Sequence, residues 1–409
     1  MEYEILKVPG INVTARLDDG VMRVGVKGGL TKFFNTRIQK IADHINNEKP
    51  AAVFDDKFYY SLYVPPIPSK AFKRVMKARV IKNVMRRFIP EAATLAITQR
   101  CPCKCIHCSA YGRDRSKELP TAVWKKIIDD LLAMGCYNVT FTGGEPTLRE
   151  DLYELIKHVD KEKAITQMFT TGYFLDKKMA KKLKDAGLQA VQISIDSPDP
   201  KEHNKLRGIP GLFDKAMDAI KNAKEAGLLV GISTYATHEN LNNGKLLKLI
   251  NLAGEWGVNE VTVFDAVPTG RFIDRGIMLT PNDNKKLITM HHQLNSRKKG
   301  SRVSIMAYVK GPDAAGCISG RTYVHVTAAG EVCPCDFTPL SFGNVTKENI
   351  KKVWGRIRKH PEYKCERLTC QMQVPDFRKR YIEKIPDGVE MPYPINTLDR
   401  HCSQIGGFK

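Results

Sequence analysis

The sequence predicts an α/β protein built around a parallel sheet that curves into a partial, TIM-like (βα)6 barrel. From Ala92 to about Ala266, short apolar runs that suit buried strands alternate with stretches of helical periodicity. Four of the expected helices are followed by a glycine, as at C-caps: Gly135, Gly187, Gly227 and Gly257. Such alternation favours a parallel sheet with helices packed around it.

The expected strands span, in order, Thr94–Thr98, Asn138–Thr142, Ile165–Thr171, Ala190–Asp196, Leu229–Thr237 and Glu260–Ala266. The helices between them span Thr121–Met134, Asp151–Val159, Lys177–Ala186, Leu212–Ala226 and Asn243–Trp256. The carboxyl ends of parallel strands meet at one face of a barrel, where the active sites of such folds gather. We therefore expect function in the loops that follow these strands.

We expect four segments along the chain. Residues 1–65 form a small N-terminal α/β appendage, and residues 66–91 form a basic amphipathic helix with its Pro-rich linker. Residues 92–300 form the barrel, and residues 301–409 form a C-terminal α+β domain. In the appendage we expect a strand at Val21–Val26 and a helix at Asn35–Asn47. In the C-terminal domain, Arg321–Val326 and Glu331–Cys335 predict a hairpin, and Lys347–Arg358 predicts a helix.

The basic helix has an unusual pattern. No acidic residue occurs from Lys57 to Pro90, and the apolar residues of the helix change face near Arg79. Phe72, Val75, Met76 and Val80 form one stripe, and Ile81, Val84, Met85 and Phe88 form the other. A helix on a single core keeps one stripe. The pattern indicates either a kinked packing helix with a solvated basic face or a helix held between the protein and a second apolar surface.

The formal net charge of +21 over 409 residues favours anionic partners: nucleic acid, lipid headgroups or acidic substrates. No run reaches the ~18 apolar residues that a membrane span needs, and the N-terminus lacks the pattern of a signal peptide. Eleven cysteines without an export signal favour metal ligands over disulfides. We expect a cytoplasmic protein in a reducing, anaerobic cell, either free or peripheral on the inner face of the membrane.

A loop of three cysteines follows the first expected strand. Cys101, Cys105 and Cys108 have the spacing Cys-x3-Cys-x2-Cys. Three thiolates can hold three irons of a [4Fe–4S] cube, whereas a closed cluster takes four cysteines. One iron is then open to another molecule, as one position is in catalytic zinc sites. Zinc bound with Cys103 as a fourth thiolate is the alternative, but zinc ligands usually come as two separated pairs, and we interpret Cys103 as a bystander.

The segment Gly143-Gly144-Glu145-Pro146 follows the second expected strand. Together with the cysteine loop, it resembles the radical S-adenosylmethionine (radical SAM) superfamily. The resemblance implies that Cys101, Cys105 and Cys108 bind the open cluster and that S-adenosylmethionine (SAM) binds beside it.

The same resemblance assigns SAM-binding roles along the barrel. Gly143, Gly144 and Glu145 resemble the edge that contacts the methionyl amine, and glycines with a carboxylate suit that task. Arg207 resembles the arginine that grips the carboxylate, for which its bidentate fork is suited. The other positions that resemble cofactor contacts are Thr170 and Thr171 after the third strand, Ser194 and Asp196 at the ribose, and Val267–Arg271 near the adenine. His107 fills a position where packing is expected. No catalytic residue is expected beyond the cluster and SAM.

The C-terminal cysteines carry a second resemblance. Cys317-x12-Gly330-x4-Cys335 resembles the start of the auxiliary-cluster extensions called SPASM or twitch domains. The full SPASM pattern continues with four cysteines spaced x2, x5 and x3, whereas this chain has Cys365-x4-Cys370 and a distant Cys402. The departure favours one auxiliary [4Fe–4S] cluster, hence two clusters in all. Its expected ligands are Cys317, Cys335, Cys370 and, by proximity, Cys365, with Cys333 and Cys402 as competitors for the fourth position.

The family resemblance implies an enzyme that cleaves SAM reductively, with electrons from a reductase such as ferredoxin or flavodoxin. The resulting 5′-deoxyadenosyl radical would take hydrogen from an unactivated C–H bond. The basic helix favours a membrane lipid chain as the substrate, with an anionic membrane surface as a partner. A maturase that crosslinks or oxidises a ribosomally made peptide is the alternative. RNA modification is a third and less favoured hypothesis: the net charge favours it, but no RNA-binding module is visible. No DNA partner is expected.

Overall fold

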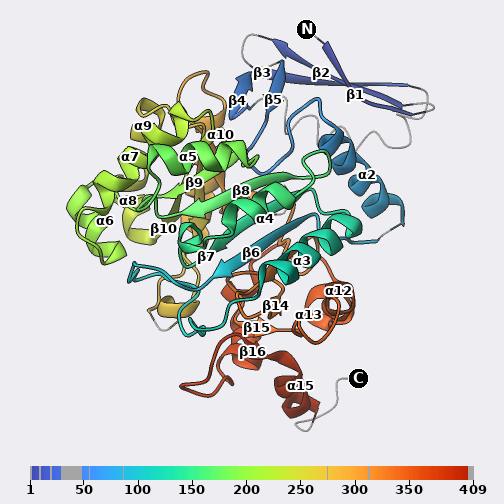
Figure 1. Ribbon diagram of the computed structural model, residues 1–409, viewed down its shortest axis with the longest axis vertical. Coiled ribbons are helices and arrows are strands. Elements are labelled where there is room, and N and C mark those ends of the chain that lie inside the picture. Colours follow the sequence, from blue (N-terminus) through green and yellow to red (C-terminus); the bar gives the residue numbers. More distant parts are fainter. Residues whose placement is uncertain are drawn as a thin grey trace.

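The structure is a computed structural model that describes residues 2–8, 11–18, 21–28, 48–54, 56–85, 87–273, 275–311 and 314–403. Its centre is a nine-stranded sheet in the order β12-β11-β10-β9-β8-β7-β6-β13-β14. Neighbouring strands run parallel except β13 and β14, which are antiparallel. Figure 1 shows helices packed along this sheet. The predicted α/β fold with a partial barrel is confirmed.

The six expected strands are β6 (Ala92–Thr98), β7 (Asn138–Gly143), β8 (Ile165–Thr170), β9 (Ala190–Ser194), β10 (Leu229–Ala236) and β11 (Glu260–Asp265). The five expected helices are α3 (Thr121–Met134), α4 (Leu152–His158), α5 (Lys177–Asp185), α7 (Leu212–Glu225) and α9 (Lys245–Glu255). Two short helices, α6 (Pro200–Arg207) and α8 (His238–Asn242), lie in loops that follow β9 and β10.

The two faces of the sheet differ in chemistry. Outward-facing side chains such as Val139 and Phe141 of β7 are fully buried and belong to the same apolar core as Trp124 of α3. Between them Thr140 points inward and lines a cavity, as does Thr94 of β6, because successive strand residues face opposite sides. Small polar side chains on the inner face leave a hollow barrel, unlike the filled interior of a closed TIM barrel.

Two further parallel strands extend the sheet beyond the six. The strand β12 (Arg302–Ile305) joins β11, and β13 (Tyr323–Val326) joins the free edge of β6, with Tyr323 opposite Ala92. The expected hairpin is present, because β13 also pairs with β14 (Val332–Cys333). Its first strand nevertheless belongs to the barrel sheet. A partner more than 200 positions away in the chain is invisible to local patterns.

The C-terminal part surrounds this added edge with short elements. The helices α10 (Pro281–Asn295) and α11 (Met306–Val309) flank β12. After β14 come β15 (Leu340–Ser341), α12 (Ile350–Lys359), α13 (Pro361–Lys364), η3 (Gln371–Gln373), α14 (Pro375–Phe377), η4 (Arg378–Ile382), β16 (Tyr393–Pro394) and α15 (Ile395–Ser403). The expected helix at Lys347–Arg358 corresponds to α12. The proposed boundaries between the four segments stay a prediction.

The N-terminal part is a three-stranded antiparallel sheet of β1 (Glu2–Val8), β2 (Ile11–Asp18) and β3 (Val21–Lys27), followed by the β4 (Ala52–Phe54) and β5 (Lys57–Tyr59) hairpin. The expected helix at Asn35–Asn47 lies outside the described residues. The next segment crosses the amino-terminal end of the barrel: the Leu62 backbone N–H and the Ser61 hydroxyl donate to the Glu260 carboxylate at 2.6 and 2.9 Å.

The basic helix is α2 (Lys70–Met85). Phe72 and Val75 of its first apolar stripe are buried in a small core with Phe58 and Tyr137. In the second stripe, the side chains of Ile81 and Val84 lie outside the described ones, while Met85 is 64% exposed. The first stripe therefore packs on protein, as an ordinary helix does.

Candidate active site

The first cysteine loop, residues 101–108, lies at the carboxyl end of β6 and is held from two sides. The backbone N–H of Lys104 donates to the Arg207 carbonyl at 2.9 Å, and that of Ile106 donates to the Leu206 carbonyl at 3.0 Å. From the other side, the Arg271 guanidinium donates to the Lys104 carbonyl at 2.9 Å. Arg271 was expected near the adenine, and the structure shows that it clamps the cysteine loop.

Close backbone approach requires the glycines around this loop. A Cβ added to Gly270, whose φ is +54°, would lie 2.0 Å from the Cys108 carbonyl oxygen. A Cβ on Gly143 or Gly144 would lie 2.0 Å or 2.3 Å from the carbonyl oxygens of Thr98 and Arg100. Glycine alone fits such contacts, so these motifs position the loop whatever else they bind.

The thiols of the loop are poised for metal binding. A hydrogen bond from the Cys103 thiol lowers the pKa of Cys105 to about 6, and the nearby Arg207 guanidinium adds to the shift. Cys103 also lowers the pKa of Cys101, whereas burial raises the pKa of Cys108. Metal ligands must be thiolates, so two of the three predicted ligands are already biased towards the binding form.

Asp196 and Arg207, predicted as separate SAM contacts, meet each other in the structure. Arg207 Nε and Nη2 donate to the two oxygens of Asp196 at 2.6 and 2.9 Å, a bidentate ion pair. The paired guanidinium lowers the pKa of Asp196 although burial opposes this. Ser194 is 3.1 Å from Ser233. All four side chains line the cavity, and their contacts with SAM stay a prediction.

Glu145 is held by hydrogen bonds within the chain, and its contact with the methionyl amine stays a prediction. Its side chain is fully buried, and its carboxylate accepts five hydrogen bonds from Thr147, Thr170 and Thr171 at 2.6–3.2 Å. It therefore ties the Gly143-Gly144 turn to the end of β8. Thr170 and Thr171 line the cavity together with Gly143 and Gly144, whereas Glu145 is not among its lining residues.

His107 packs as expected. Its ring lies 4.4 Å from that of Tyr235, centroid to centroid, and burial lowers its pKa to about 4. A neutral imidazole at neutral pH follows from that shift. Its Nε2 is 3.6 Å from Asp196, so the ring also supports the Asp196–Arg207 pair.

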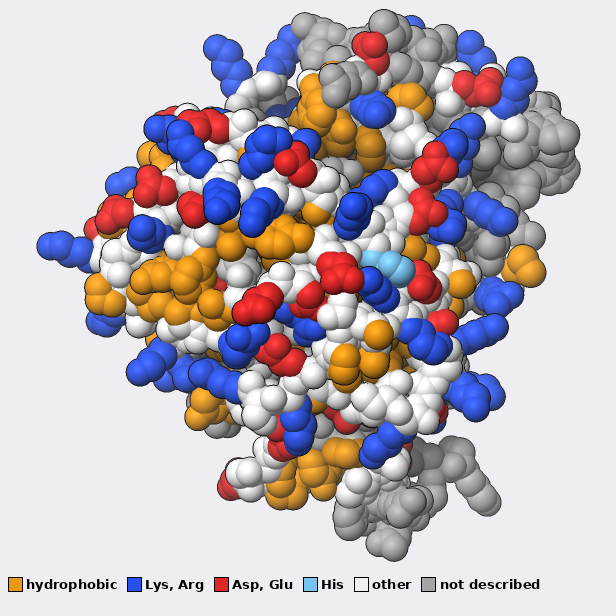
Figure 2. All heavy atoms as spheres, in the orientation of Figure 1, with side chains coloured by type: hydrophobic (Ala, Val, Ile, Leu, Met, Phe, Trp, Pro, Cys, Tyr) orange, Lys and Arg blue, Asp and Glu red, His pale blue; other side chains and the backbone are white. Residues whose placement is uncertain are grey.

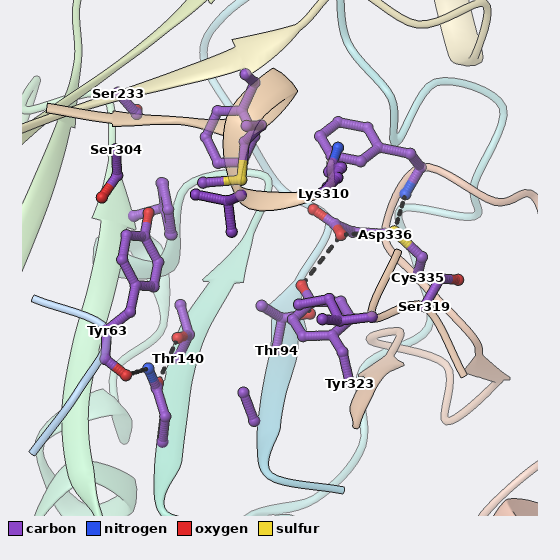
Figure 3. A pocket seen from close by; sticks show the side chains of 18 of the residues that line it. Tyr63, Thr94, Thr140, Ser233, Ser304, Lys310, Ser319, Tyr323, Cys335 and Asp336 are labelled. Carbon is purple, nitrogen blue, oxygen red and sulfur yellow. Dashed lines mark hydrogen bonds between the residues drawn. The ribbon is translucent and has the colours of Figure 1, made fainter. Parts of the chain in front are cut away.

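A cavity of about 2420 Å³ connects this loop to the C-terminal cysteines. Figure 3 shows barrel side chains, among them Thr140 and Ser304, on one side, and Lys310, Cys335 and Asp336 on the other. Pockets for drug-sized ligands are typically ~300–1,000 Å³. The room is thus large enough for the cofactors together with a sizeable substrate.

The auxiliary trio, defined as Cys317, Cys335 and Cys370, lines the far part of the cavity. The Lys310 ammonium lies 4.0 Å from Asp265, and this carboxylate together with the three thiols raises its pKa although burial opposes the shift. Burial raises the pKa of Cys370 to about 11. An ammonium beside three thiols suits a cluster whose ligands carry negative charge.

The fourth auxiliary ligand stays a prediction. Cys365 is exposed and is not among the residues that line the cavity. Cys333 is buried in β14 and is also absent from the lining, and the side chain of Cys402 lies outside the described ones.

Sequence reasoning missed several polar residues of the cavity. Asp265 ends β11, Lys310 follows α11, and Asp336 accepts a hydrogen bond from the Tyr323 hydroxyl at 3.0 Å. Arg113, which follows the first cysteine loop in the sequence, contacts His325 of β13 at 2.8 Å and donates to the Asp336 carbonyl at 3.2 Å. Of these residues, only Asp265, at the end of an expected strand, and Asp336, directly after Cys335, could have been recognised as candidate site residues from the sequence.

Both cysteine sets fit [4Fe–4S] clusters. The first loop presents three thiols at the cavity wall, and the auxiliary trio presents three more around Lys310. Among the described residues, no three His, Cys, Asp or Glu side chains converge on one point as the ligands of a single ion do. The thiolates of a cube bind separate irons and stand apart.

Known proteins were compared with this chain at the level of family, sequence and structure. Residues 95–253 match the radical SAM superfamily, and residues 317–381 match SPASM, an iron–sulfur cluster-binding domain.

Two of the similar proteins show the range of activities among the relatives. A PqqA peptide cyclase of Bradyrhizobium diazoefficiens is 30% identical over 292 residues, 68% of this chain and 76% of the relative. An AdoMet-dependent heme synthase of Methanosarcina barkeri is 25% identical over 289 residues, 65% and 82% of the two chains.

Among solved structures, Streptococcus suis SuiB bound to its precursor peptide SuiA has a TM-score of 0.58 at 16% identity, covering 89% of this chain and 90% of that one. This likeness shows the shared fold. The motifs, the cavity and the family matches agree: the chain belongs to the radical SAM superfamily, as an iron–sulfur-dependent enzyme with a C-terminal SPASM domain.

Proposed function

We propose that this enzyme modifies a peptide, by crosslinking or oxidising a side chain. When bound, the cluster of the first loop and SAM supply a 5′-deoxyadenosyl radical that removes hydrogen from an unactivated C–H bond. The protein contributes the cavity that holds the target beside that site.

The wall of the cavity carries this proposal. Eight residues that line it each have a buried polar side-chain atom without a hydrogen-bond partner in the described part of the chain, among them Asp265 Oδ1, Thr234 Oγ1, Thr269 Oγ1 and Ser319 Oγ. An unpaired buried polar group costs about 1–3 kcal/mol. A peptide backbone offers N–H and C=O groups that would satisfy these atoms, whereas an acyl chain offers none.

Two of the three similar proteins named above favour a peptide substrate. One relative is named as a peptide cyclase, and SuiB was solved with a precursor peptide. Another is named as a heme synthase. None of these three names includes a lipid.

The membrane-lipid hypothesis has less support. The first stripe of α2 packs on protein, and no helix in the described residues is long and apolar enough to cross a membrane. In Figure 2, Lys and Arg side chains are spread over the face shown, with Asp and Glu between them. The helix α2 itself contains no acidic residue, so this mixing describes the surrounding face and not the helix.

Isotope transfer tests the substrate class directly. Source cells are grown in deuterated medium, and their extract is divided into a peptide fraction, a lipid fraction and a small-molecule fraction. Each is incubated with reconstituted enzyme, SAM and dithionite under anaerobic conditions. We expect deuterium in 5′-deoxyadenosine with the peptide fraction alone, and loss of the signal after protease treatment.

Transfer from the lipid fraction would restore the lipid hypothesis. Transfer from protease-resistant small molecules would also overturn the peptide proposal. Unlabelled extracts provide the matched control for background exchange.

A further inference from the structure

A cluster of cations surrounds one aromatic ring where α2 meets the C-terminal part. The ring belongs to Phe88, which follows α2, and the Trp354 indole of α12 donates to the Phe88 carbonyl at 3.3 Å. Lys82 Nζ lies 5.8 Å from the ring centroid, and the guanidinium carbons of Arg321 and Arg358 lie 5.2 and 4.6 Å from it. With Arg79, one turn before Lys82, these three residues form the Phe88 cation cluster.

The positive charges in this cluster are incompletely balanced. Arg79 pairs with Glu91 at 3.4 Å, and Arg321 pairs with Glu366 at 2.9 Å. Lys82 has no carboxylate within ion-pair distance among the described residues. Four cations thus face two carboxylates.

The fourth cation of the cluster, Arg358, interacts with backbone carbonyls. Arg358 donates to backbone carbonyls, with Gly320 at 3.0 Å and Lys364 at 3.1 Å. Burial and repulsion from the neighbouring Arg321 guanidinium lower the pKa of Arg358 to about 10. Burial and Arg79 likewise lower the pKa of Lys82.

One hydrogen-bond donor of the cluster has no acceptor among the described residues. The Nε of Arg321 is buried and has no hydrogen-bond partner in the described part of the chain, although the residue is only 4% exposed. Burying an arginine donor without an acceptor is costly. Arg79, Lys82, Phe88 and Arg321 all line the cavity that leads to both cysteine sets.

We propose that the Phe88 cation cluster binds a carboxylate of the substrate, the side chain of a Glu or Asp in an acidic peptide segment. An anion there would balance the excess charge and offer an acceptor to Arg321 Nε. The inference rests on the proposed function, because it names which peptides the cavity takes.

Binding of defined probes tests this inference. Fluorescein-labelled hexaglutamate and hexaglutamine are titrated into anaerobically reconstituted enzyme at low and high salt. We expect hexaglutamate to bind, binding to weaken with salt, and hexaglutamine not to bind. The variant Lys82→Glu should weaken hexaglutamate binding about tenfold or more, because it replaces an attraction by a repulsion. Lys82→Met, which keeps an apolar stem on Phe88, should lie between.

Lys182→Glu is the matched control, because Lys182 Nζ lies 5.5 Å over the Tyr153 ring on another helix. It should bind hexaglutamate as the unmodified enzyme does. Iron content and thermal unfolding of every variant show whether the fold is kept. Equal affinities in Lys82→Met, Lys182→Glu and the unmodified enzyme would overturn the inference.

Vesicles of phosphatidylglycerol form the last arm. Binding to vesicles that depends on Lys82, without binding of hexaglutamate, would assign the cluster to a lipid headgroup and overturn the inference. If protease-sensitive deuterium transfer is seen while hexaglutamate does not bind, the carboxylate site is wrong and the peptide function stands. If hexaglutamate binds through Lys82 but no peptide transfers deuterium, the peptide function is wrong.

Discussion

The two cysteine sets hold similar thiols in opposite electrostatic environments. In the first loop, the Cys103 thiol and the Arg207 guanidinium lower the pKa of Cys105 to about 6. In the auxiliary trio, burial raises the pKa of Cys370 to about 11 and that of Cys335 well above its usual value. Cys101 and Cys105 of the first set are biased towards thiolates by their neighbours, whereas Cys335 and Cys370 of the second depend on metal to displace their protons.

The two sets also differ in how the chain holds them. The three cysteines of the first loop lie within eight residues of sequence, and glycines with Arg271 clamp that loop from outside. The auxiliary trio comes from three separate segments: Cys317 precedes β13, Cys335 follows β14, and Cys370 precedes η3. A local motif and a tertiary assembly thus serve the same cavity.

The largest expected effect follows from removing the first set. Replacing Cys101, Cys105 and Cys108 by alanine should remove about four irons per chain and abolish 5′-deoxyadenosine formation. Iron analysis and chromatography of the nucleoside measure both. Cys136→Ala, which removes a buried thiol outside both sets, is the control and should keep both properties. If the triple variant still cleaves SAM, the site is wrongly assigned.

Removing the auxiliary trio should separate the two sites. Replacing Cys317, Cys335 and Cys370 by alanine should also remove about four irons, but SAM cleavage without substrate should persist, because the first loop is intact. Single Cys365→Ala and Cys333→Ala variants then identify the fourth ligand by their iron content. Loss of all iron in the trio variant would show that the two sites do not form independently.

Gly270→Ala should impair cluster binding by the first cysteine loop and leave the auxiliary trio unaffected. The added Cβ would collide with the Cys108 carbonyl, and a strained backbone costs about 1–3 kcal/mol. We expect slower SAM cleavage and lower occupancy of the first cluster, read by electron paramagnetic resonance of the reduced protein. Gly276→Ala is the matched control: its φ of +60° is similar, but no atom lies within 4 Å of the added Cβ. Equal behaviour of the two variants would contradict the clamp.

Arg207→Lys should weaken SAM binding about tenfold, because an ammonium cannot replace a bidentate guanidinium. Isothermal titration of the reconstituted enzyme measures the affinity, and iron content should not change. The structure adds a second readout: loss of the pair with Asp196 should also lower the unfolding temperature. A lower unfolding temperature with unchanged SAM affinity would make Arg207 purely structural.

The smallest expected effect concerns the thiols without metal. In chelator-treated protein at pH 7, iodoacetamide should modify Cys105 faster than Cys370, because the thiolate is the nucleophile. A pKa near 6 makes Cys105 mostly thiolate above that pH, whereas a raised pKa keeps Cys370 protonated until the solution is strongly alkaline. Peptide mapping by mass spectrometry gives both rates. Equal rates would remove the electrostatic contrast between the sets.

The sequence by itself determined the six central strands, the five helices between them and the loop of three cysteines. These features depend on short-range periodicity and spacing, which the chain displays directly. Tertiary structure alone decided that β13 completes the edge of β6, that Asp196 meets Arg207, and that Phe88 gathers cations from α2 and the C-terminal part. Each of these depends on contacts between distant segments, and local sequence patterns carry no record of which distant partner a side chain will find.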